Sequence, residues 1–333
     1  MHCLRVAAVV VLGGIVIQAT RADVTTVSIF SKSNNRNIDF RVYTPPGYTT
    51  TSARYPVVYS LHGIGGTAQN RVSQVVPTLD AAILAGTAQP MVYVFPDGQT
   101  NSFYGDAFDG HKQVDSNIIG EVLPYVDAHY RTRADRRWRA MEGFSMGGFG
   151  AAMYTAKHPE LFSAVVEYGG ALSKWQDLVQ FNGAVASEMY NTNEANFRPF
   201  SLWDLTGANA ATLRDSVSYK MIVGSADSQQ QSNARFRDYL FSLSIDPHYQ
   251  VLPGVTHNGT TYYAEGSGLR FLADHFAHAG GAGDQKYPFV LLPEPGALAL
   301  LAVSALLTLR CRGSEVAISR SGPRRRQAPA RRR

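Results

Sequence analysis

Cysteine is almost absent from this chain of 333 residues. Its two cysteines, Cys3 and Cys311, lie near the two ends, so residues 23–292 contain none. This excludes a disulfide within that segment, a zinc site built on cysteine pairs and a cysteine nucleophile. A segment of about 270 residues is long enough to bury a full hydrophobic core without such cross-links.

An excess of positive charge is also lacking once the chain ends are set aside. The formal net charge is +5, to which residues 1–22 contribute +2 and residues 293–333 contribute +7, so residues 23–292 carry −4. The sequence pI of about 9.1 therefore reflects the two ends. It does not indicate a protein that binds nucleic acid.

Long apolar runs are missing, and two short runs lie near the ends. The first, residues 6–17, follows Arg5 and precedes the small-residue segment Ala19–Ala22. A basic residue, a short apolar stretch and small residues are typical of a secretory signal peptide, which we predict over residues 1–22. The alternative is an N-terminal membrane anchor, although the run is short for a spanning helix.

The second apolar run, residues 297–309, follows Pro293–Gly296 and precedes Arg310 and Arg312. Thirteen apolar residues are marginal for crossing a bilayer, and the arginines would hold that end in the cytoplasm. This order of motif, apolar run and basic residues resembles the PEP-CTERM sorting signal of Gram-negative bacteria. The resemblance implies export, transient association with the inner membrane and processing by an exosortase. The expected location is therefore outside the cell or in its envelope.

The rest of the chain shows no internal repeat and predicts a single domain, residues 23–278. A Gly/Ala-rich linker, residues 279–292, would join this domain to the sorting signal with its short transmembrane segment, residues 293–312. Residues 313–333 form a basic tail.

Within the domain, short β-rich segments alternate with helical patterns. Residues 24–30 and 38–43 predict a leading hairpin, and residues 117–129 predict a helix that Pro124 should kink. Six further strands are expected at residues 56–61, 91–95, 139–144, 164–168, 220–223 and 248–252. Uninterrupted apolar strands separated by helices indicate an α/β fold, with a mostly parallel sheet covered by helices on both faces.

The strongest functional signal is the segment Gly143-Phe-Ser145-Met-Gly147, which lies between a strand and a small-residue helix. Gly-x-Ser-x-Gly in this context is typical of a nucleophile elbow, a sharp turn that lifts the serine to the helix N-terminus. The flanking glycines let neighbouring chain approach closely. We therefore predict that Ser145 is a nucleophile. A purely structural glycine turn is the alternative.

The segment Leu61–Gly66 directly follows another predicted strand. Acyl transfer from such a serine needs two backbone N–H groups aimed at the oxyanion. One comes from the residue after the nucleophile, here Met146, and Ile64 is the candidate for the other. His62 precedes the serine in the chain, whereas the expected order is serine, acid and histidine. We therefore interpret His62 as a structural loop residue.

His257 is the predicted general base, because it lies in a loop after a strand end and follows the serine in the chain. The other histidines after Ser145 fit this role less well: His158 is too close in sequence, His248 begins a strand, and His275 and His278 end a helix.

Asp227 is the predicted acid, since it follows the strand at residues 220–223 and could orient the imidazole from behind. Asp204, Asp215 and Asp246 are its rivals in the right interval.

Residues 61–66, Phe95–Gly98, Leu123–Asp127 and the elbow together resemble the esterase D-like family. That family includes feruloyl esterases, S-formylglutathione hydrolases and mycolyltransferases. The resemblance covers about residues 24–278. It implies an α/β-hydrolase fold, no metal and no cofactor. The site residues that it implies are a triad of Ser145, Asp227 and His257 with an oxyanion hole at Ile64 and Met146.

Aromatic residues supply the candidates for substrate binding, namely Phe103, Tyr104 and Trp175. Trp175 belongs to a long connection, residues 173–215, that is rich in polar and aromatic residues. This connection could form a lid or an acyl-binding wall. Alternatively, its aromatic residues simply pack a helical excursion.

These features together predict a secreted serine carboxylic-ester hydrolase, similar to feruloyl or acetyl esterases that act on carbohydrate-linked esters. One alternative is an acyltransferase that uses the same triad, similar to mycolyltransferases. A second is a non-catalytic surface binding protein. A metal-dependent hydrolase is disfavoured because no His-Glu-x-x-His segment is present. The expected partners are an ester substrate and the export machinery, and no nucleic acid.

Overall fold

The structure is a computed structural model that describes residues 21–280. The chain divides into two compact units, Met1–Tyr287 and Pro288–Arg333, and all described residues belong to the first. Almost the whole predicted signal peptide, most of the linker, the sorting signal and the basic tail lie outside the described residues. Within residues 21–280, no helix combines the length and the apolar character that membrane crossing requires.

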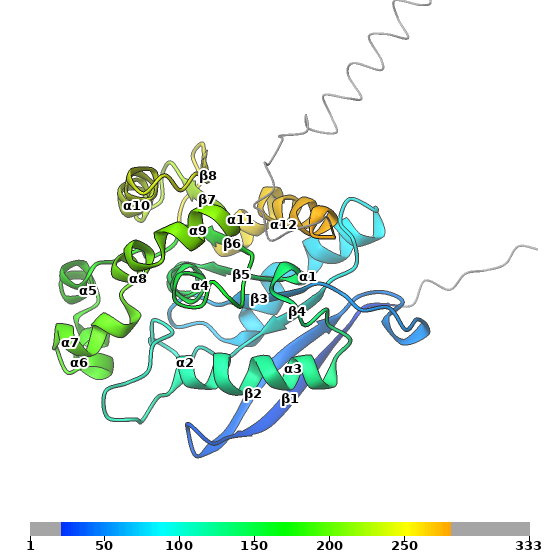
Figure 1. The fold of residues 1–333 in the computed structure, drawn as a ribbon, viewed down its shortest axis with the longest axis horizontal. Coiled ribbons are helices and arrows are strands. Elements are labelled where there is room, and N and C mark those ends of the chain that lie inside the picture. The colour runs from blue at the N-terminus through cyan, green and yellow to red at the C-terminus, as the bar shows by residue number, and fades with distance from the viewer. Residues whose placement is uncertain (1–20, 281–333) are drawn as a thin grey trace, which may run out of the picture. The chain divides into compact units, whose positions relative to one another are not determined.

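An eight-stranded sheet runs through the described residues (Figure 1), in the order β1-β2-β4-β3-β5-β6-β7-β8. The strands are β1 (Asp23–Ser31), β2 (Arg36–Thr44), β3 (Val57–Leu61), β4 (Val92–Phe95), β5 (Arg139–Phe144), β6 (Ala164–Tyr168), β7 (Ser218–Gly224) and β8 (Pro247–Leu252). β1 and β2 form the predicted hairpin, and β2 pairs antiparallel with β4. All pairs among β3 to β8 are parallel.

Helices cover both faces of the sheet (Figure 1), which confirms the predicted fold class. The main covering helices are α1 (Ala68–Leu84), α2 (Val114–Asn117), α3 (Leu123–His129), α4 (Met146–Lys157), α10 (Gln230–Ser242), α11 (Gly259–Ala264) and α12 (Ser267–His278). α4 and α10 pack on one face of the sheet, and α1 and α12 pack on the other. The central strands β3 to β6 are buried almost throughout, as expected for a parallel sheet that is covered on both faces.

The predicted helix over residues 117–129 is present, but Pro124 does not kink it in the expected way. Instead, a π-helical turn at Ile118–Val122 separates α2 from α3, and Pro124 lies in the first turn of α3. The helical path is continuous here, since the N–H of Leu123 bonds the carbonyl of Ile118, and the wider π-helical turn accommodates the proline, which has no N–H to donate.

The long connection at residues 173–215 folds into five short α-helices and one 3₁₀ turn, Arg198–Phe200. The α-helices are α5 (Trp175–Phe181), α6 (Gly183–Tyr190), α7 (Glu194–Phe197), α8 (Leu202–Ala208) and α9 (Ala210–Ser216). Tyr190 and Phe197 are buried, and their ring centroids lie 5.3 Å apart in an edge-to-face pair. These two aromatic residues therefore pack a helical excursion, which was the simpler of the two sequence interpretations.

A buried ion pair joins α1 to the centre of the sheet. Arg71 and Glu142 are both fully buried, and Arg71 Nη2 lies 3.1 Å from Glu142 Oε1. Ser60 accepts a hydrogen bond from Arg71 Nε and donates one to the same carboxylate oxygen. Burial raises the pKa of Glu142, and the positive charge of Arg71 opposes that rise. The pair shows how this fold keeps a charge inside its core: each partner has its counter-charge and further hydrogen bonds.

His275 of α12 links the beginnings of two strands. Its Nε2 lies 2.8 Å from Ser163 Oγ, just before β6, and its Nδ1 lies 3.2 Å from Ser218 Oγ, at the start of β7. Burial, followed by the charges of Arg136 and His278, lowers the pKa of the imidazole from 6.5 to about 4. The folded protein therefore holds this ring neutral in mildly acidic solution.

We predict that His275 makes the protein less stable as the pH falls from about 6.5 to about 4. In that window the unfolded chain binds a proton that the folded chain does not, so the free energy of unfolding falls by up to about 3 kcal/mol. In His275→Gln, which cannot titrate, this part of the acid dependence should disappear. Urea unfolding of both proteins across this pH range measures it. A constant difference in unfolding free energy between them would contradict the prediction.

Candidate active site

Ser145 lies in a strained turn between β5 and α4. Its backbone has φ 58° and ψ −117°, a conformation that residues with side chains rarely adopt. Only glycine fits two residues before it and two residues after it. A Cβ added at Gly143 would lie 2.1 Å from the carbonyl oxygen of Gly147, and one at Gly147 would lie 2.3 Å from that of Leu61. The Gly-x-Ser-x-Gly segment therefore owes its glycines to close backbone contacts.

Backbone hydrogen bonds from the segment after β6 hold this turn in place. Ser145 donates from its N–H to the carbonyl of Tyr168 over 3.0 Å, and its own carbonyl accepts from Ala171 over 2.9 Å. Gly170 lies so close to the start of α4 that a Cβ at Gly148 would be 2.8 Å from its Cα. We call residues 168–171 the clamp segment, because it holds Ser145 from both sides.

The structure brings the three residues of the predicted triad together. His257 Nε2 lies 2.9 Å from Ser145 Oγ, and His257 Nδ1 lies 2.9 and 3.0 Å from the two carboxylate oxygens of Asp227. Asp227 follows β7 and His257 follows β8, so all three residues lie beyond the carboxyl ends of neighbouring parallel strands. The side chain of Asp227 is fully buried, whereas that of His257 is 30% exposed, so the imidazole is open to solvent on one side.

Asp227 is ionised and held by further donors. Burial alone would raise the pKa of its carboxyl, but hydrogen bonds from His257, from the Tyr262 hydroxyl and from the N–H of Gln229 outweigh this and lower it. Tyr262 Oη donates to Asp227 Oδ2 and accepts from the N–H of Gly224 over 2.6 Å. The phenol thus fixes the carboxylate to the end of β7. Sequence reasoning missed Tyr262, which lies five residues after His257.

The ring of His257 is supported by Phe144, the residue before the serine. The two ring centroids lie 4.6 Å apart with an angle of 34° between the planes. The following residue, Asn258, caps α11 by accepting a hydrogen bond from the N–H of Thr261. A ring contact on one side and a capped helix on the other therefore limit how the imidazole can turn. The motif gave no reason to expect this role for Phe144.

Both predicted oxyanion donors belong to segments that adjoin the serine. Met146 is the first residue of α4, and the loop with Ile64 passes Ser145 at Gly63, where an added Cβ would be 3.4 Å from Ser145 Cβ. Within residues 21–280, neither the N–H of Ile64 nor that of Met146 has a protein acceptor. Both N–H groups are thus free to donate to a ligand.

His62 fixes this loop and takes no part in the triad. The ring is 1% exposed; its Nδ1 bonds the carbonyl of Gly63 over 2.8 Å, and its Nε2 accepts from the N–H of Gly98 over 2.9 Å. Both ring nitrogens are therefore used in holding backbone. This placement agrees with the sequence interpretation of a structural loop residue.

The structure corrects the prediction that Phe103 and Tyr104 contact substrate, because their rings are only 1% and 0% exposed. Both residues have positive φ values, 50° and 58°, in a left-handed turn that directs them inward. Phe103 donates from its N–H to Met146 Sδ, and Tyr104 Oη donates to the carbonyl of His62. The Tyr104 side chain thus supports the loop at residues 62–66, which we call the oxyanion loop, whereas Phe103 holds the side chain of Met146 through its backbone N–H.

Trp175 lies in the helical excursion and is half-buried. Its ring packs against Tyr190 and Phe197, with centroids 6.4 and 5.6 Å away. No hydrogen bond or ring contact among the described residues joins it to the triad. It lines a separate small hollow of about 200 Å³ with Trp203 and Tyr239.

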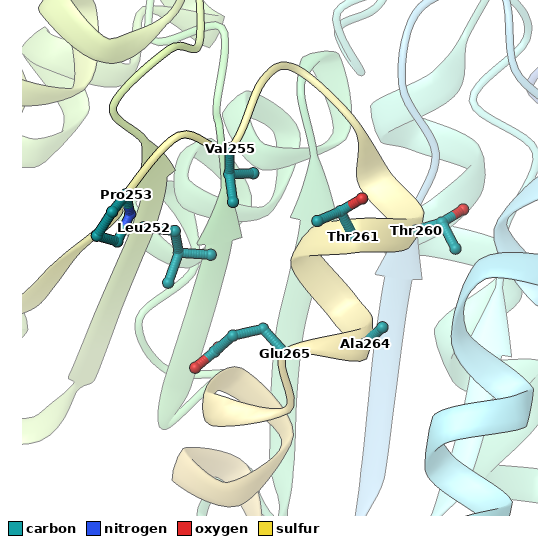
Figure 2. A pocket seen from close by; sticks show the side chains of 7 residues that line it. All are labelled: Leu252, Pro253, Val255, Thr260, Thr261, Ala264 and Glu265. Atoms are coloured by element: carbon teal, nitrogen blue, oxygen red, sulfur yellow. The ribbon is translucent and has the colours of Figure 1, made fainter.

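A larger hollow of about 570 Å³ flanks the loop that carries His257 (Figure 2). Its walls are Leu252, Pro253, Val255, Thr260, Thr261, Ala264 and Glu265. All of these come from one continuous stretch, the end of β8 and α11, and none is a predicted site residue. The hollow is therefore a depression beside the His257 loop, and it does not join the elements that carry Ser145 and Asp227.

No group of three or more His, Cys, Asp or Glu side chains within residues 21–280 is arranged to hold a metal ion.

Most of the sequence that contains this site matches a known protein family. Residues 31–237 match the model of the esterase family, described as "Putative esterase", and this range is more than half of the chain. The chain therefore belongs to the esterase family. The matched range includes Ser145 and Asp227 and ends before His257.

Two proteins illustrate the similarity at the level of sequence. An esterase of Mycobacterium tuberculosis is 33% identical over 180 residues, which cover 52% of this chain and 38% of that protein. An endo-1,4-beta-xylanase/feruloyl esterase of Xylanibacter ruminicola is 32% identical over 162 residues, covering 45% of this chain and 21% of that protein. The chain thus matches well under half the length of either relative.

Solved structures extend the similarity to the fold. A ferulic acid esterase superposes with a TM-score of 0.67 at 25% identity, over 77% of this chain and 99% of the other. An S-formylglutathione hydrolase from Agrobacterium tumefaciens superposes with a TM-score of 0.61 at 22% identity, over 80% and 97%. The sheet and its covering helices are therefore those of the α/β-hydrolase fold found in these esterases.

The close contacts of the elbow lead to a prediction on stability. In Gly147→Ala the new methyl group would meet the backbone of Leu61 and His62, neither of which can move without distorting the sheet or the oxyanion loop. We expect the free energy of unfolding to fall by about 3 kcal/mol or more. Thermal or urea unfolding measures it.

Gly183→Ala is the matched control, because nothing lies within 4 Å of the added methyl group at the start of α6. Its stability should be unchanged or higher by up to about 1 kcal/mol. Equal effects of the two substitutions would contradict the role assigned to the glycines of the elbow.

Proposed function

We propose that this chain hydrolyses carboxylic esters, with Ser145 as nucleophile, His257 as general base and Asp227 as the acid that orients it. The observation that carries the proposal is the unbroken series of hydrogen bonds from Ser145 Oγ through the imidazole to the buried carboxylate. Such a series activates an otherwise weak hydroxyl nucleophile. Membership of the esterase family and the fold of ferulic acid esterase support it further.

The reaction would proceed in two steps. Ser145 Oγ attacks the ester carbonyl carbon while its proton passes to His257 Nε2, and Asp227 stabilises the resulting imidazolium. The oxyanion accepts hydrogen bonds from the N–H groups of Ile64 and Met146, and the N-terminus of α4 favours the same negative charge. His257 then returns the proton to the leaving alcohol, which departs as the acyl-enzyme forms.

Water completes the cycle. It attacks the acyl carbon of the acyl-enzyme while giving a proton to His257, and the second tetrahedral intermediate breaks down to the free acid and Ser145, which recovers its proton from the imidazole. If an alcohol on a sugar or lipid replaced water at this stage, the same residues would perform acyl transfer. The second step therefore separates the esterase from the mycolyltransferase-like alternative.

For the substrate, we propose feruloyl or acetyl esters of carbohydrates. The support comes from proteins of similar sequence or fold, a xylanase/feruloyl esterase and a ferulic acid esterase. An acetyl group and a feruloyl group differ greatly in size, so a panel of esters with different acyl groups can distinguish them.

The test is hydrolysis of p-nitrophenyl acetate, methyl ferulate, acetylated xylan and S-formylglutathione by the full-length protein and its Ser145→Ala variant. We expect turnover of the acetate or ferulate esters that falls at least about 1,000-fold in the variant, because the acyl-enzyme can no longer form. Asp227→Asn should lose a factor of about 10,000 through the wrong imidazole tautomer. Ser187→Ala, at an exposed position on α6, is the matched control and should keep full activity.

Further measurements separate the esterase from the two alternative functions. Labelling by a fluorophosphonate that requires both Ser145 and His257 would contradict a non-catalytic binding protein. Product analysis with an added alcohol acceptor separates hydrolysis from acyl transfer. A folded protein with no turnover that depends on Ser145 would overturn the esterase proposal.

We also propose that the protein acts outside the cytoplasm, on the strength of the predicted signal peptide and the PEP-CTERM-like segment in the sequence. In a Gram-negative host, we expect the mature protein in the envelope or medium, with a new N-terminus close after Ala22. Cell fractionation and N-terminal mass spectrometry measure this, with a variant that lacks residues 1–22 as control. An intact N-terminus in the cytoplasm would contradict it.

A further inference from the structure

Glu167, the penultimate residue of β6, is a buried carboxyl group without a counter-charge. It is 0% exposed, and its Oε2 accepts a hydrogen bond from the N–H of Gly170 over 2.7 Å. Its Oε1 has no hydrogen-bond partner among the described residues. Burial raises the pKa of this carboxyl to about 8. The hydrogen bond from Gly170 opposes this rise, and the charge of Asp227 adds a smaller increase in the pKa. Glu167 is therefore a neutral acid at neutral pH.

The register of the sheet places other polar groups around it. Glu167 is paired with Met221 of β7, and Met221 is paired with Tyr249 of β8, so these side chains and that of Tyr219 point to the face covered by α10. Asn233 reaches the same face from α10 and is fully buried. Besides Glu167 Oε1, the side-chain oxygens of Tyr219, Asn233 and Tyr249 have no hydrogen-bond partner within residues 21–280.

The charged and titratable groups on this side are few. The electrostatic neighbours of Glu167 are Asp227 after β7 and the phenols of Tyr219, Tyr249 and Tyr262. Arg237 of α10 lies over the ring of Tyr249, and its guanidinium carbon is 4.7 Å from the ring centroid; Asp238 is also near that phenol. None of these supplies Glu167 with an ion pair, so its ionised form would be a buried, unpaired charge beside the carboxylate of Asp227.

Glu167 and Asn233 together hold the clamp segment from behind. Glu167 accepts from the N–H of Gly170, and the Asn233 amide donates to the Gly170 carbonyl over 2.7 Å. The same peptide region binds the backbone of Ser145 on its other side. It also borders the acid, since a Cβ at Gly169 would lie 2.8 Å from Asp227 Oδ2. The position of Gly170 therefore affects both the backbone of Ser145 and the surroundings of Asp227.

We infer that Glu167 is a positioning residue for the proposed ester hydrolysis: in its neutral form it fixes the clamp segment, which holds the Ser145 backbone and borders Asp227. Loss of its proton places a second, unpaired negative charge behind the triad. The bond to Gly170 becomes stronger, but repulsion between this charge and the carboxylate of Asp227 displaces the clamp segment between them. The inference rests on the proposed function and adds to it a carboxyl group that touches neither Ser145 nor the substrate. Ionisation of Glu167 thus makes the geometry of the triad sensitive to alkaline pH.

The experiment compares the full-length protein with Glu167→Gln and Glu167→Leu by measuring kcat and KM for p-nitrophenyl acetate from about pH 6 to about pH 10. Glutamine keeps an acceptor for Gly170 and cannot ionise. We expect its kcat near pH 7 to lie within about 3-fold of the parent, and the fall in kcat that the parent shows above about pH 8 to be absent.

Leucine removes the acceptor, so kcat should fall about 10- to 100-fold while KM changes little, because the triad and not the substrate contacts are displaced. Glu160→Gln, an exposed glutamate substitution, is the control and should reproduce the parent profile. The inference is overturned if Glu167→Gln keeps the alkaline fall of the parent, or if Glu167→Leu retains the kcat of the parent.

A second measurement does not depend on ester hydrolysis. Because the pKa of Glu167 is higher in the folded state than in the unfolded chain, its contribution to stability is full below about pH 4.5 and is lost as the pH rises to about 8. Relative to the parent, Glu167→Gln should therefore gain stability across that window, measured by urea unfolding. A gain in the absence of any turnover by the parent would mean that the proposed function fails. Turnover that depends on Ser145, without this gain, would mean that only the inference on Glu167 fails.

Discussion

The positive φ of Ser145 is the constraint on which the rest of the site depends. A serine in this conformation is unfavourable by itself, so the surrounding chain must hold it. Two glycines allow backbone to approach within distances that no side chain would permit, and the clamp segment provides hydrogen bonds on both sides of the serine. As a result of this backbone conformation, the side-chain oxygen lies at the N-terminus of α4 and within hydrogen-bond distance of His257.

Parallel strand order converts residues that are far apart in sequence into neighbours. Ser145 and His257 are 112 positions apart, yet each lies just beyond the carboxyl end of a strand in the same run of parallel neighbours. Because the carboxyl ends of parallel strands meet at one edge, the sequence could predict which loops would converge once the strands were assigned. The elbow, the loop after β7 and the loop after β8 were all predictable in this way.

Residues that support the triad from neighbouring segments could not be predicted in the same manner. Tyr262 reaches Asp227 from the helix that follows His257, and Phe144 reaches the imidazole across the elbow. Neither contact follows from a spacing in the sequence. The error on Phe103 and Tyr104 has a similar origin: aromatic residues in a polar loop suggest a binding surface. Their positive φ values, which no composition reveals, direct the rings inward.

The two buried glutamates of neighbouring strands show why pattern alone cannot assign a role. Glu142 and Glu167 both stand inside apolar strands and are fully buried, but on opposite faces of the sheet. Glu142 meets Arg71, a serine and a tyrosine, so its charge is compensated inside the core. Glu167 meets a backbone N–H and no cation, and its environment favours the neutral acid. The same residue type thus serves as a structural ion at one face and as a protonated support for the clamp segment at the other. The difference lies in which helix covers each face: α1 brings an arginine, and α10 brings an amide.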